Sequence, residues 1–193
     1  MVIYKKGETM STRVLGSILI VGSLAVALNS FRSSDAFDLI SSIALMLWCI
    51  GGVFGLIGML RLNALGQNPV ARAFGFLPIL GFVTILLADS LRLAGVYPMG
   101  TPVNNALAAI GWIAILAGML VVGIITIAAK TWTGWRRFVP LLIIVFIPVS
   151  LGLGSLIGDM QVSGAVAYLA WIVLGYVIAT GSPVQELRAA VNG

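Results

Sequence analysis

Long apolar runs follow one another along almost the whole chain. Charged residues, glycine and proline separate them into six stretches, at about residues 14–29, 37–60, 73–91, 103–129, 138–157 and 162–180. A helix needs about 20 apolar residues to cross the hydrocarbon core of a bilayer. The runs lack the alternating polar and apolar positions of membrane β-strands. The sequence therefore predicts an all-α membrane protein, a bundle of six transmembrane helices.

The basic residues predict how this bundle is oriented. Of the 11 Lys and Arg residues, all but Arg32 and Arg92 fall in the N-terminal tail (1–13), in the second and fourth loops, or in the C-terminal tail (181–193). Cytoplasmic loops carry the excess of Lys and Arg in membrane proteins. We therefore expect both tails to be cytoplasmic and residues 14–180 to form the transmembrane domain, in a cell inner (plasma) membrane.

The composition excludes several chemistries. The chain has 60% apolar and only 9% charged residues, whereas a soluble domain has about 25% charged residues. It has no histidine, and Cys49 is its one cysteine, so it lacks the ligands for a bis-histidine haem, a His-bearing zinc site or an iron–sulfur cluster. We expect no cofactor and no metal, and the sequence favours a role other than an enzyme.

The expected partner is the lipid bilayer. The net charge of +5 does not indicate nucleic acid, because the basic residues lie at helix ends rather than along a continuous face.

The first apolar stretch has two interpretations. A basic tail, an apolar run and the segment from Ala25 to Ala27 (Ala-Val-Ala) are also the features of a secretory signal with its cleavage site. Met1 and Met10 are both candidate translation starts. A membrane helix and a cleaved signal both remain open at this point.

The chain shows signs of an internal three-fold repeat. Ala44, Ala108 and Ala167 each precede a tryptophan by four residues, which places both side chains on one helix face. The odd stretches share an arginine followed by glycines at similar spacing, as in Arg13 with Gly22 and Arg72 with Gly81. These matches predict three copies of one two-helix hairpin, stacked around a common axis.

The three repeated tryptophans, Trp48, Trp112 and Trp171, are expected close to the middle of the membrane. Tryptophan usually lies at the interface, where its N–H can reach water. One hypothesis is that each ring packs over a small residue of its own hairpin. The other is that the three rings face a shared axis and line a pore or pocket.

Four charged residues are candidates for the outer mouth of such a pore: Asp38, Asp89, Arg92 and Asp159. Arg92 follows Asp89 by three residues and lies on the same side of a helix. This spacing predicts an ion pair at the end of the third span, near water.

Glycine clusters predict close contacts between helices, because glycine lets two backbones approach. The candidate seam consists of Gly51, Gly55 and Gly58 in the second span and Gly154 and Gly158 in the fifth. Such a seam can pack helices of one chain, or it can join a second copy or another membrane protein.

The leading functional hypothesis is a channel or transporter-like protein for a small neutral or weakly polar solute. The repeat, the tryptophans and the mostly uncharged interior favour it. The alternative is a non-catalytic accessory or scaffold subunit of a membrane complex that binds through its glycine faces.

Overall fold

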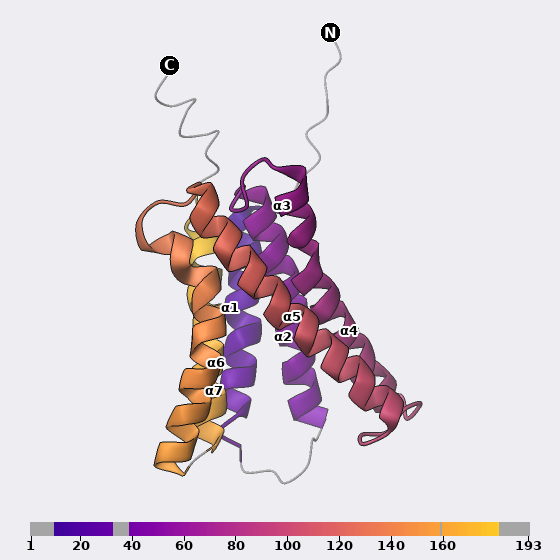
Figure 1. Cartoon of the computed structure of the whole chain (residues 1–193). Helices are drawn as coiled ribbons and strands as arrows, with labels where there is room; N and C mark the ends of the chain where they lie inside the picture. The colour runs from indigo at the N-terminus through magenta and orange to yellow at the C-terminus, as the bar shows by residue number, and fades with distance from the viewer. Residues whose placement is uncertain (1–9, 33–38, 159, 182–193) are drawn as a thin grey trace, which may run out of the picture.

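The computed structural model describes residues 10–32, 39–158 and 160–181, and this part of the chain is helical without any strand (Figure 1). The elements in chain order are α1 (Thr12–Asn29), α2 (Leu39–Arg61), α3 (Pro69–Phe74), α4 (Phe76–Leu93), α5 (Pro102–Ala129), the 3-10 turn η1 (Gly134–Phe138), α6 (Val139–Ile157) and α7 (Met160–Ala179). The prediction of an all-α chain is confirmed.

Within the described ranges, five segments are long and apolar enough to cross a membrane. They are α1, α2, α3 with α4 (Pro69–Leu93), α5, and η1 with α6 (Gly134–Ile157). In α7 the apolar stretch Ser163–Ala179 is shorter, about 25 Å at 1.5 Å per residue. The six predicted stretches therefore all form helices within a few residues of the predicted bounds, and five of these helices have the length and composition of membrane spans.

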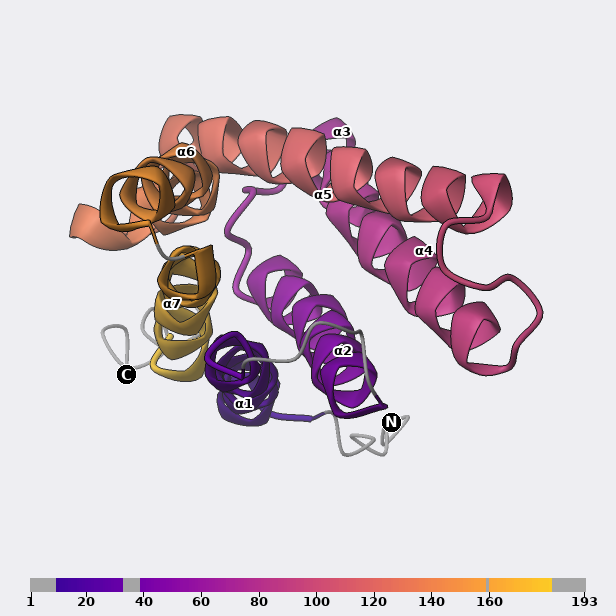
Figure 2. The same cartoon turned by 90° about the horizontal axis from the view of Figure 1, so that it is seen from below.

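The long helices form a ring in chain order. The hairpin partners α1 and α2, α4 and α5, and α6 and α7 pack against each other, α2 also packs on α4, and α5 on α6. The ring closes where α7 packs on α1, as the view along the bundle shows (Figure 2). The α4–α5 hairpin is inclined to the other helices, so its lower end diverges from α6 and α7 (Figure 1).

Local sequence signals set several helix ends. The Thr101 hydroxyl accepts a hydrogen bond from the Asn104 amide at 3.4 Å, and Pro102 occupies the first turn of α5, as an N-cap followed by proline predicts. In the loop after α2, Asn63 and Gly66 have φ of 53° and 72°. That left-handed backbone turns the chain back toward α3 and α4.

Glycines hold neighbouring helices at backbone distance. A Cβ on Gly22 of α1 would lie 2.4 Å from the Leu47 carbonyl oxygen of α2, and a Cβ on Gly81 of α4 would lie 2.6 Å from the Gly111 carbonyl oxygen of α5. A Cβ on Gly16 would lie 2.4 Å from the carbonyl oxygen of Gly175, where α1 meets α7. A side chain at these positions would force the helices apart.

The two ends of the bundle differ in charge. Helix ends and loops on the side where α1 begins and α7 ends carry six of the basic residues that the structure describes: Arg13, Arg61, Arg72, Lys130, Arg136 and Arg137. We call this the basic end. At the opposite end, which we call the distal end, the described basic residues are Arg32 and Arg92.

The glycine contacts predict a position-dependent effect of one added methyl group. Gly22→Ala should destabilise the protein by about 1–3 kcal/mol, because the new Cβ meets backbone atoms of α2 that cannot rotate away. Gly152→Ala in α6 is the matched control, since no atom lies within 4 Å of its Cβ position. It should leave stability unchanged or raise it by up to about 1 kcal/mol. Thermal unfolding midpoints in detergent compare the two, and equal midpoints would contradict the proposed contact.

Candidate functional site

Five aromatic side chains from four helices meet inside the ring. This aromatic cluster consists of Trp48 of α2, Phe82 of α4, Trp112 of α5, and Tyr168 and Trp171 of α7. The Trp48 ring is its centre, with centroids 4.9 Å from Phe82, 5.4 Å from Trp112, 5.4 Å from Tyr168 and 5.7 Å from Trp171. Phe82 and Trp171 also touch, at 5.2 Å. The three tryptophans of the predicted repeat are therefore brought together.

Ring geometry explains how the aromatic cluster holds together. Four of these contacts are edge-to-face, with interplanar angles of 72° to 87°, and Trp112 stacks on Trp48 at 28°. Edge-to-face and offset stacked pairs are the arrangements that aromatic quadrupoles favour, worth about 0.5–1.5 kcal/mol each beyond burial. The aromatic cluster thus links helices on opposite sides of the ring.

The aromatic cluster lies about halfway along the helices. Trp48, Trp112 and Trp171 are 9 to 11 residues from the distal-end starts of their helices, which is about 14–17 Å. Trp48 and Phe82 are fully buried, Trp171 is 4% exposed and Trp112 is 38% exposed. Trp112 thus offers one covered face and one accessible face.

One polar atom in the aromatic cluster is left without a partner. The Nε1 of Trp48 is buried and has no hydrogen-bond partner among the described residues. Buried indole N–H groups usually find an acceptor. The aromatic cluster therefore contains one donor that a small molecule could engage.

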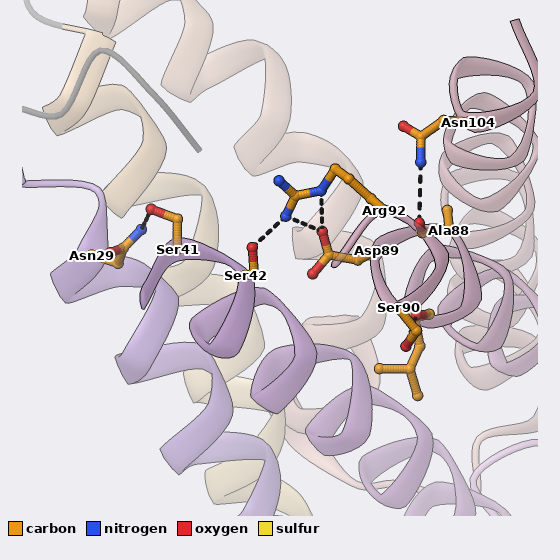
Figure 3. A network of polar contacts seen from close by, with 9 residues as sticks. Asn29, Ser41, Ser42, Ala88, Asp89, Ser90, Arg92 and Asn104 are labelled. Atoms are coloured by element: carbon orange, nitrogen blue, oxygen red, sulfur yellow. Dashed lines mark hydrogen bonds and ion pairs between the residues drawn. The ribbon is translucent and has the colours of Figure 1, made fainter. Parts of the chain in front are cut away.

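A second group of polar side chains lies nearer the distal end, between α4 and α2. Arg92 Nε donates to Asp89 Oδ1 at 2.9 Å, and Arg92 Nη2 contacts both Asp89 Oδ1 and the hydroxyl of Ser42 (Figure 3). We call Ser42, Asp89 and Arg92 the polar triad. The ion pair predicted from the spacing of Asp89 and Arg92 is confirmed.

The expected exposure of this pair to water is wrong. Asp89 is 5% exposed, Ser42 is fully buried, and the side chain of Arg92 is 12% exposed. The physical reason is that α2 packs on this face of α4, so the pair points between two helices rather than out of the bundle. Asp89 Oδ2 is buried and has no partner among the described residues.

Two amide side chains flank the polar triad (Figure 3). Asn104 of α5 is 7% exposed and donates from Nδ2 to the Ala88 carbonyl at 3.1 Å. Asn29 of α1 donates from Nδ2 to the Ser41 hydroxyl at 3.1 Å. These bonds fasten α5 to α4 and α1 to α2 at the distal end.

The glycines of the candidate seam have different places. Gly51 and Gly55 face Ile18 and Leu19 of α1, and Gly58 faces Ile178 and Leu15. They pack helices within one chain, and Gly154 is buried on α6.

Gly158 does not fit a packing role. It ends α6 with φ of 73°, and nothing lies within 4 Å of its Cβ position. Its left-handed conformation makes it a helix C-cap, a role that glycine fills without strain. Of the other predicted mouth charges, Asp38 and Asp159 lie outside the described residues.

Sequence reasoning missed Phe82, Tyr168 and Ser42. Phe82 precedes Asp89 by seven residues, which is two helical turns on one face, so the depth and direction of Asp89 could have indicated it. Tyr168 lies three residues before Trp171, on a similar side of α7. Ser42 carries no such signal, because serine is common on helices of every kind.

The aromatic cluster and the polar triad offer ring faces and hydrogen-bonding groups. The described residues contain no group of three or more His, Cys, Asp or Glu side chains that could hold a metal.

Comparison of the chain with protein-family models, with curated proteins and with solved structures gives no match. The fold and site therefore define a class only. The chain is an all-helical protein whose apolar helices are compatible with a membrane.

The burial of the ion pair predicts a large asymmetry between single and double variants. Arg92→Met should cost about 3–5 kcal/mol of folding free energy, because it leaves the Asp89 carboxylate buried without its counter-charge. The double variant Asp89→Asn with Arg92→Met should recover part of this loss, since no ion then remains buried. Thermal unfolding midpoints in detergent measure both. A double variant less stable than Arg92→Met would show that the charge balance is not the cause.

Proposed function

We propose that the chain is a six-span membrane protein of the channel or transporter class. In this proposal the aromatic cluster closes a path for a small neutral or weakly polar solute. The proposal takes the described packing as the closed state, in which the packed rings of the aromatic cluster block the path and the partly accessible Trp112 lies at its approach.

The observation that carries the proposal is the meeting of three hairpins at one point. Trp48, Trp112 and Trp171 come from different hairpins yet lie at similar depth, and both Trp112 and Trp171 contact the Trp48 ring. If each ring only filled space within its own hairpin, contacts between tryptophans of different hairpins would not be expected. Constrictions of apolar side chains are a recurrent way to close a membrane path.

The predicted repeat has support from two of its three copies. In the first hairpin Gly22 packs on Leu47, the residue before Trp48. In the second, Gly81 packs on Gly111, the residue before Trp112. The same contact at the same register is what repeated hairpins would produce, and sites at repeat interfaces near the midplane are typical of transporters.

The proposed orientation follows from the difference between the two ends. Six described basic residues at the basic end and two at the distal end favour a cytoplasmic basic end under the positive-inside rule. The proposed sixth span is α7, which has 20 residues in all and packs between α1 and α6.

One observation favours the alternative, an accessory or scaffold subunit. Trp48 and Phe82 are fully buried and pack against each other and other rings, as in a rigid structural core. A protein of this kind would hold partners through its outer faces and would never open.

A topology experiment tests the six spans and the orientation. Reporter fusions at Gly66, Thr133 and the C-terminus should read cytoplasmic, and fusions near residues 34, 99 and 160 should read external. The internal fusion points each lie between two proposed spans, and the C-terminus follows the sixth. Paired phosphatase and fluorescent-protein reporters give the side. A cytoplasmic reading at Met99 would contradict six spans.

A flux experiment separates the conduit from the scaffold. Trp112→Ala should raise the permeability of proteoliposomes to urea or glycerol about tenfold, the effect of a barrier lower by about 1.4 kcal/mol, because a stacked ring is removed from the closed centre. Trp135→Ala is the matched control, since Trp135 is 54% exposed in η1 at the basic end. Stopped-flow light scattering measures both.

Three outcomes of this flux experiment are informative. A rise with Trp112→Ala alone supports the conduit. The conduit proposal is contradicted, and the scaffold favoured, if the unaltered protein and both variants are no more permeable than empty liposomes. This comparison covers water, urea, glycerol and monovalent ions. An equal rise for both variants would mean that the loss of any tryptophan makes the protein leak.

A further inference from the structure

We propose that the polar triad is a binding site for a small neutral molecule that donates hydrogen bonds, an alcohol or an amide. This inference rests on the proposed function and names the solute class that would pass the aromatic cluster. The site lies between α2 and α4, toward the distal end (Figure 3).

The free carboxylate oxygen defines what the ligand must supply. Asp89 is more than nine-tenths buried, and its Oδ1 is held by Arg92 while its Oδ2 has no partner among the described residues. In the close-up the free oxygen points away from α5, toward α2 (Figure 3). A carboxylate oxygen only accepts hydrogen bonds, so a molecule that fills this place must present an O–H or N–H group.

The charge of the pair favours a neutral ligand over a cation. Asp89 and Arg92 together carry no net charge, and a neutral molecule leaves that balance unchanged. An unpaired ion added at this depth would face the large cost of desolvation in a low-dielectric surrounding. The polar triad therefore selects through hydrogen bonding rather than through charge.

Along α4, the aromatic cluster follows the polar triad on the side of the basic end. Asp89 and Phe82 are seven residues apart on one face of α4, about 10 Å, and Phe82 touches Trp48. There the unpartnered atom is a donor, the Nε1 of Trp48. Asp89 Oδ2 near the distal end can only accept a hydrogen bond, and Trp48 Nε1 in the aromatic cluster can only donate one. Alcohols and amides can both donate and accept hydrogen bonds, so they match both atoms.

Asp89→Asn inverts the hydrogen bonding of the site with little change of shape, and it also removes the charge that offsets Arg92. In Asp89→Asn the amide oxygen can keep the bond from Arg92, and the amide nitrogen then replaces Oδ2. The free position changes from an acceptor to a donor. Ser90→Ala is the matched control, because Ser90 is exposed on the same helix and its hydroxyl bonds only to the Leu86 carbonyl of its own helix.

Infrared difference spectroscopy of the purified full chain tests binding without requiring transport. Glycerol added to the unaltered protein should shift a carboxylate stretching band, and that band should be missing from Asp89→Asn and present in Ser90→Ala. A band that shifts only on exchange of H₂O for D₂O, and not with glycerol, would show that water alone occupies the position and would overturn the inference.

The flux assay distinguishes failure of this inference from failure of the proposed function. If the unaltered protein carries urea or glycerol, Asp89→Asn should lower that flux at least about tenfold, about 1.4 kcal/mol in the barrier, while Ser90→Ala leaves it unchanged. Two results would overturn the binding-site inference but not the proposed function. One is unchanged flux in a stably folded Asp89→Asn variant, and the other is a flux of monovalent cations above that of urea. If no solute crosses but the glycerol-dependent band is present, the proposed conduit function is contradicted and the proposed binding site is supported.

Discussion

Close contact between helix backbones is the constraint on which the rest of this structure depends. Lipid tails are as apolar as the side chains that would pack, so helices gain little from hiding leucine from lipid and associate through van der Waals contact instead. Gly22 against Leu47, Gly81 against Gly111 and Gly16 against Gly175 supply that contact in α1, α2, α4, α5 and α7. The short distances draw the helices close enough for large rings to meet in the middle.

Polar groups at depth have a cost that the apolar fold must outweigh. The Asp89 carboxylate and the Arg92 guanidinium offset each other's charge, but Asp89 Oδ2 and Trp48 Nε1 remain without partners among the described residues. Each unmade hydrogen bond costs about 1–3 kcal/mol. Leucine or phenylalanine at these two positions would avoid that cost, so packing alone does not account for the polar atoms there.

The sequence predicted the helices well because the signals for them are local. Apolar length depends only on neighbouring residues, and the six predicted stretches form helices within a few residues of the predicted bounds. The exposure of Asp89 was predicted wrongly, since it depends on the packing of α2 over α4. Phe82 and Tyr168 were missed for the same reason. Periodicity places a residue on a helix face, but only the relative rotation of helices decides what that face meets.

The inclination of the α4–α5 hairpin bears on where the proposed conduit would open. Its lower end diverges from α6 and α7 (Figures 1 and 2), while the Arg92–Ser42 contact and the ring pair Phe82–Trp48 fasten it to α2. A hairpin that rocks on α2 would separate Trp112 from Trp48 before it disturbed any glycine contact within a hairpin. In the proposed conduit the Trp48–Trp112 pair would be the contact that separates on opening, because backbone contacts resist separation whereas a stacked ring pair at 5.4 Å can slide.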